Sequence, residues 1–102
     1  MSLHKNNPMG LQGSLQGEGT LRFTGRAHLV GYRIFVWRRD RRLLADGGIE
    51  GASDVLLDAY KQPSCTLDLE SGETIEIVVM HFGSGTGADI TVRGPVPSLP
   101  GT

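Results

Sequence analysis

The segment AHLVGYRIFVWR, residues 27–38, carries the clearest structural signal in this chain. It is rich in β-branched and aromatic residues, which favour a strand and crowd the χ1 angle of a helix. Both faces of such a strand are apolar over residues 34–37, which predicts a central strand covered on both sides. Period-two alternation assigns Leu29, Phe35 and Trp37 to one face, and Val30, Tyr32, Ile34 and Val36 to the other.

A second strand pair is predicted over residues 65–79, where apolar residues again recur at every second position. A three-residue loop, Glu70-Ser71-Gly72, sets Leu67 opposite Ile75 and Cys65 opposite Ile77, so that apolar side chains share one face. The same loop places Gly72 at the left-handed position of a three-residue hairpin. Register and turn chemistry therefore predict the same hairpin.

Further short strands are predicted around this pair, over residues 14–19, 20–24, 43–45 and 88–93. Asp46-Gly47-Gly48 is a turn signal, and Gly31 indicates a bulge or a close backbone approach. Six to eight short strands are typical of a single, mainly β, antiparallel β-sandwich or barrel. Residues 53–62 fit a strand or one short helix, the helix having Ser53 as its N-cap and Pro63 as its stop.

The 102 residues suit one domain. Residues 1–12 are polar and are predicted to form a flexible N-terminal arm, and residues 13–93 the single β domain. Residues 94–102 hold three of the five prolines, which predicts an extended, flexible Pro-rich tail.

Charge divides the chain more sharply than its formal net charge of −1 indicates. Residues 1–45 hold eight Lys and Arg side chains and two acids, whereas residues 46–102 hold two Lys and Arg side chains and nine acids. The basic and acidic strands either pair beside each other within one sheet or form separate faces of opposite sign.

Enzyme chemistry finds little support in the sequence. Cys65 falls on the predicted buried face, where a thiol has a raised pKa and is inert. The acids Asp46, Glu50, Asp54 and Asp58 cluster near a glycine turn, but their spacing matches no calcium loop. The glycines of residues 83–87 lack the context of a phosphate-binding loop. No catalytic residue, metal or cofactor is predicted.

Arginines interleaved with aromatic residues over 22–42 are the one candidate binding surface. Guanidinium groups that neutralise phosphates beside rings that stack on bases suit a single-stranded nucleic acid. Against this, Tyr32 and Trp37 are assigned to opposite faces of the strand. The candidate contact residues are Arg26, Arg33, Trp37, Arg38, Arg39, Arg41 and Arg42.

The sequence therefore predicts a non-catalytic protein-interaction or self-assembly β module, whose partner is a further copy of itself or another protein. A nucleic-acid-binding β-barrel is the first alternative, and a carbohydrate-binding sandwich with an exposed Tyr60 or Trp37 is the second. No run of 18 apolar residues is present, and the first ten residues lack the apolar core of a signal peptide, so no membrane partner and a cytoplasmic location are expected.

Overall fold

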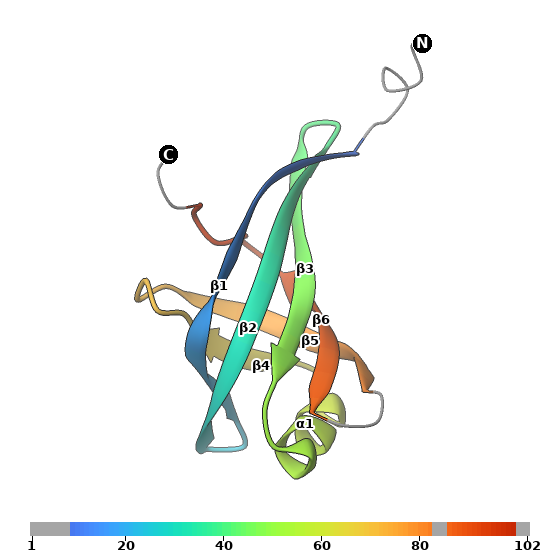
Figure 1. Cartoon of the computed structure of the whole chain (residues 1–102). Helices are drawn as coiled ribbons and strands as arrows, with labels where there is room; N and C mark the ends of the chain where they lie inside the picture. Colours follow the sequence, from blue (N-terminus) through green and yellow to red (C-terminus); the bar gives the residue numbers. More distant parts are fainter. Residues whose placement is uncertain (1–8, 83–85, 100–102) are drawn as a thin grey trace.

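A computed structural model describes residues 9–82 and 86–99, which form a closed barrel of antiparallel strands with one short helix (Figure 1). The strands follow the order β1-β2-β3-β6-β5-β4 around the barrel, and β4 returns to pair with β1. This confirms the mainly β prediction. Of the two predicted architectures, sandwich and barrel, the structure is the barrel. The elements are β1 (Met9–Phe23), β2 (Arg26–Arg39), β3 (Arg42–Glu50), α1 (Ser53–Tyr60), β4 (Cys65–Asp68), β5 (Thr74–Phe82) and β6 (Gly87–Arg93).

Strand β2 lies between β1 and β3, and its two faces have different environments. The inward residues Val30, Tyr32, Ile34 and Val36 are buried in the core, as the alternation predicts. The opposite face is not covered: Leu29 is 72% exposed, and Phe35 and Trp37 are only half-buried. The prediction of a strand covered on both sides is therefore wrong, because a closed barrel has one interior and its outer face meets solvent.

The hairpin of β4 and β5 confirms the predicted register. Leu67 pairs with Ile75 and Cys65 with Ile77. The Leu69 N–H donates to the Glu73 carbonyl at 2.8 Å, which closes the loop. Gly72 has a φ of 96°, a left-handed conformation that glycine adopts without steric cost. Local turn chemistry thus determines this part of the barrel.

The predicted turn at Asp46-Gly47-Gly48 is wrong, because β3 runs through it without interruption. A Cβ atom at Gly47 would clash with the Arg33 carbonyl oxygen of β2. Gly47 therefore allows β2 and β3 to approach each other closely, and the chain does not change direction there. Gly31 is likewise no bulge, since its register with β1 is regular.

Residues 53–60 form the helix α1, which resolves the two alternatives for this segment. The helix packs against β5 and β6 and buries Leu56 and Ala59. Its N-cap is Ala52, with no side-chain cap hydrogen bond, so the assignment of Ser53 is wrong. Burial of the apolar face stabilises the helix in place of a cap.

Both terminal segments contain residues that belong to the folded barrel. Residues 9–12 belong to β1, and residues 95–99 lie against the barrel. Pro97 is buried, Val96 and Leu99 pack on the core, and the Ser98 N–H donates to the two Glu73 carboxylate oxygens at 3.1 and 3.2 Å. Apolar residues between the prolines anchor this segment. Residues 1–8 and 100–102 lie outside the described residues.

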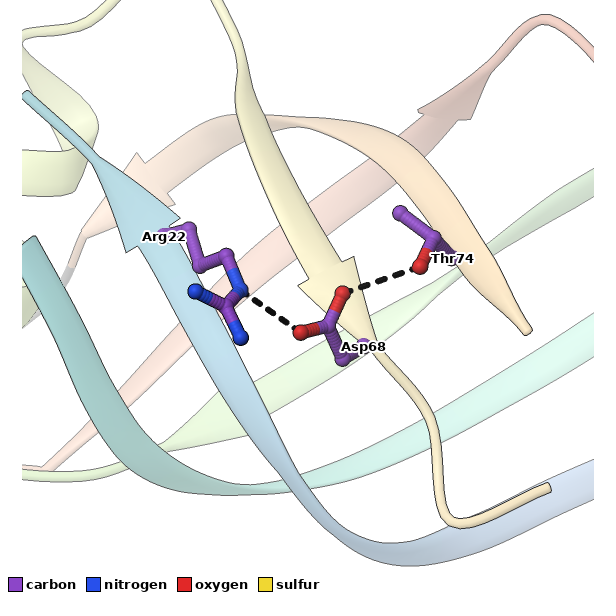
Figure 2. Close-up of polar contacts among 3 residues, drawn as sticks. All are labelled: Arg22, Asp68 and Thr74. Carbon is purple, nitrogen blue, oxygen red and sulfur yellow. Dashed lines mark hydrogen bonds and ion pairs between the residues drawn. The ribbon is translucent and has the colours of Figure 1, made fainter. Parts of the chain in front are cut away.

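The barrel closes along a short seam, where β1 and β4 pair from Thr20–Asp68 to Arg22–Thr66. Leu21 and Leu67 meet in the middle of this seam, and both are 0% exposed. On its outer side, Arg22 Nε donates to Asp68 Oδ2 at 2.6 Å, and Thr74 Oγ1 donates to Asp68 Oδ1 at 2.9 Å (Figure 2). One carboxylate therefore connects three strands.

These contacts predict an acid-dependent stability. The hydrogen bonds from Arg22 and Thr74 lower the pKa of Asp68 in the folded chain. A lowered pKa contributes stability above the ordinary Asp pKa, and this contribution is lost as the pH falls towards the lowered value. We expect Asp68→Asn to show a shallower loss of stability over that acidic window than the wild type, measured by urea denaturation at a series of pH values.

Asp54→Asn is the matched control, because Asp54 lies exposed on α1 and forms no ion pair with any described residue. It should retain the pH dependence of the wild type. Identical pH profiles for Asp68→Asn and the wild type would contradict the assigned role of this carboxylate.

Candidate functional site

The outer sides of β1, β2 and β3 form one continuous surface, which we call the outer face. Register aligns its side chains in rows across the strands. From the free end of the β2–β3 hairpin toward the barrel, the rows on β2 and β3 are Arg39–Arg42, Trp37–Leu44, Phe35–Asp46, Arg33–Gly48 and Gly31–Glu50. β1 adds Leu11, Ser14, Gln16 and Glu18 to the last four of these rows.

A groove of about 1190 Å³ extends over the rows from Phe35–Asp46 to Gly31–Glu50 and continues over β6 and the end of β5. Gly31, Gly48 and Gly87 line it, so much of its floor is backbone. Small-molecule pockets usually enclose roughly 300–1,000 Å³ and cover most of their ligand. This groove is larger and lies open on a strand surface, which suits a macromolecular partner.

The groove is acidic. Among its described lining residues are four acids, Glu18, Asp46, Glu50 and Asp89, and a single Arg or Lys, Arg33. Arg33 Nε donates to Gln16 Oε1 at 3.1 Å, and Trp37 Nε1 donates to Asp46 Oδ1 at 3.1 Å. The Glu50 and Asp89 carboxylates form no hydrogen bond or ion pair with a described residue. Four carboxylates against one guanidinium give the described lining of the groove an excess of negative charge.

The predicted contact residues do not form one patch. Arg38, Arg39, Arg41 and Arg42 gather at the end of the β2–β3 hairpin, which extends together with the start of β1 away from the other strands (Figure 1). Arg33 and Trp37 lie lower on the outer face. Arg26 begins β2 at the opposite end, twelve residues from Arg38 and thus about 40 Å away along the strand.

Intramolecular pairing of the two charged halves is limited. Over residues 9–82 and 86–99, the ion pairs are Arg22–Asp68 and Arg93–Glu76. Neither involves the hairpin arginines. Asp40 lies in the turn between them and forms no ion pair with a described residue, and the acids of the groove are held at a distance by the strand rise. The charge division of the sequence therefore becomes a separation in space.

The Cys65 thiol, considered above as a nucleophile, is not accessible at the surface. Its side chain is buried, Sγ donates to the Ala59 carbonyl at 3.7 Å, and burial raises the pKa of the thiol. In the described part of the chain, no three His, Cys, Asp or Glu side chains form a group that could hold a metal ion. The described helix is too short to cross a membrane.

No protein-family model, curated protein or solved structure matches this chain. The interpretation of its function therefore rests on the groove, the hairpin and the outer face between them.

Sequence reasoning missed Glu18, weighed Glu50 only as a member of an acidic cluster near a turn, and did not predict that Gly31 lies between the two. Glu18 and Glu50 flank Gly31 in one row. The alternation of 42–50 could have placed Glu50 on this surface, because it continues through the glycines once no turn is assumed there. No comparable signal marks Glu18.

Proposed function

We propose that this chain is a non-catalytic protein-interaction module that associates with further copies of itself. One observation carries the proposal: a basic hairpin end and an acidic groove occupy the same outer face. Phe35, the lining residue of the groove nearest the hairpin on β2, lies four residues from Arg39, about 13 Å, and no ion pair joins the two regions within the described chain. A second copy supplies the opposite charge for both.

The arrangement supports a protein partner more than a nucleic acid. The groove adjoining the basic hairpin presents Glu18 and Glu50, which repel phosphates. Tyr32 is buried and its hydroxyl accepts the Glu70 N–H at 3.1 Å, so it offers no stacking surface beside Trp37. A continuous basic track with several stacking rings, typical of single-strand binding, is not formed by the described residues.

Sedimentation of the intact chain at low and high salt tests this proposal. We expect reversible association at about 50 mM salt that weakens at about 500 mM, because salt screens exposed charges. A monomer under both conditions would exclude self-association. Steeply salt-dependent binding of a short single-stranded oligonucleotide, lost in Arg39→Glu/Arg41→Glu, would instead support the nucleic-acid alternative.

A further inference from the structure

The outer face is self-complementary about its central row. On β2 the outward residues are Gly31, Arg33, Phe35, Trp37 and Arg39, so that Arg39 and Gly31 lie at equal distances from Phe35. On β3, Arg42 and Glu50 lie at equal distances from Asp46. A rotation of 180° about the Phe35–Asp46 row therefore sets Arg39 against Gly31, Arg42 against Glu50 and Arg33 against Trp37 of the second copy. Phe35 and Asp46 lie on the axis and each faces its own counterpart.

We propose that two copies pack face to face about this row, with β2 antiparallel to β2 and β3 antiparallel to β3 of the second copy. The inference rests on the proposed function and specifies its interface as a closed, two-fold dimer. Packed sheets align within about 30° and lie about 10 Å apart, a geometry that long antiparallel strands can adopt.

The outermost rows supply the charge contacts. Arg39 of one copy lies over Gly31 of the other, where the absent side chain leaves room between Glu18 and Glu50. Arg42 lies over Glu50 of the second copy. Two-fold symmetry makes each of these contacts twice, and the arginines without a partner in the described monomer gain carboxylates.

The inner rows supply the apolar and aromatic contacts. Phe35 of each copy lies on the axis, and both rings are half-buried in the single chain, so they retain apolar surface to cover. Arg33 lies over Trp37 of the second copy, where a guanidinium can stack on the indole. It also brings a positive charge beside the Asp46 carboxylate that Trp37 holds.

The size of this face predicts a weak dimer. Three strands about 4.8 Å apart and about 26 Å long present roughly 400 Å² per copy. Stable interfaces bury about 1,200–2,000 Å² in total, so this one falls in the transient class. A head-to-tail contact would use one hairpin and one groove per interface and continue into chains, whereas the two-fold contact uses both at once and stops at two copies.

Charge reversal tests the pairing of the outer rows. Two double variants each reverse the charge of one outermost row: Arg39→Glu/Arg42→Glu and Glu18→Lys/Glu50→Lys. The two side chains of a row have the same sign before and after the change, so the substitution adds no new repulsion within that row. We expect each variant alone to associate at least about 100-fold more weakly than wild type at low salt. An equimolar mixture of the two should recover association as a heterodimer, without larger species.

Cross-linking tests the axis. In Phe35→Cys, two thiols lie on the axis at the spacing of packed sheets, so a short bismaleimide should give a covalent dimer. Leu29→Cys is the matched control: it lies on the same strand and face, is highly exposed, and lies about 40 Å from its counterpart in the proposed dimer. The native Cys65 is buried in both variants.

The outcomes separate the two proposals. A dimer from Phe35→Cys alone, at low salt, supports the two-fold interface. Equal cross-linking of both variants, or association of the wild type without any Phe35→Cys dimer, would overturn the interface and leave self-association standing. A wild type that stays monomeric in sedimentation at concentrations up to about 500 μM would overturn both. Circular dichroism confirms the fold of each variant.

Discussion

Gly47→Ala is expected to destabilise the barrel by about 3 kcal/mol, the upper end of the cost of overpacking. The Cβ atom would meet the Arg33 carbonyl oxygen and lie 3.0 Å from the Ile34 Cα, so backbone on β2 has to move. For a domain of this size, each kcal/mol lost lowers the melting temperature by about 4 °C or more, so we expect a decrease of about 12 °C or more. The loss is a large part of the roughly 5–15 kcal/mol of total stability that such a domain has. Calorimetry and urea denaturation measure it.

Gly31→Ala is the matched control for this substitution. Gly31 lies on the same strand pair, but a Cβ atom there would have the Gly17 carbonyl oxygen as its nearest neighbour, at 3.9 Å. An alanine in a strand interior restricts the unfolded chain, so we expect unchanged stability or a gain of up to about 1 kcal/mol. High salt removes any contribution from association. Equal losses at both positions would contradict the close-approach explanation of Gly47.

Leu67→Ala should be the second large effect, with a loss of about 3 kcal/mol in the free energy of unfolding. Leu67 is 0% exposed and pairs with Leu21 on one side and Ile75 on the other, at the seam where β4 closes the barrel. Its truncation leaves a cavity that rigid strands on both sides cannot fill. Urea denaturation monitored by Trp37 fluorescence gives the loss.

Leu29→Ala removes the same atoms from an outward position that is 72% exposed. We expect a change within about 0.5 kcal/mol, as is usual for surface substitutions. If the two leucine substitutions had similar effects, the seam would not depend on Leu67 and the barrel would tolerate an open β1–β4 edge.

The β4–β5 hairpin and the inward side of β2 could be read from the chain because their determinants are local. Gly72 and the period-two positions of Leu67, Ile75 and Ile77 allow one register that buries every apolar side chain. Strand alternation likewise assigns Val30 and Ile34 to the interior whichever strands surround them. Such features depend on neighbours within a few residues.

The remaining features depend on which distant strands become neighbours. The sequence around Gly47 is the same whether the glycine forms a turn or allows a neighbouring strand to approach closely. Only the position of the Arg33 carbonyl on β2 distinguishes these two roles. The hairpin arginines form no ion pair with a described carboxylate. On β3, Asp46 and Glu50 lie four and eight residues from Arg42, about 13 and 26 Å, and composition does not contain these spacings.

Alternation along single strands therefore sufficed to predict a small antiparallel β-sandwich or barrel, the inward side of β2 and the β4–β5 hairpin. The order of charged residues along the chain predicted its divided charge. The closure of β1 on β4, the groove, and the alignment of Glu18 with Gly31 and Glu50 required the folded chain. The physical reason is that burial follows from local periodicity, whereas a surface is made by register between strands distant in sequence.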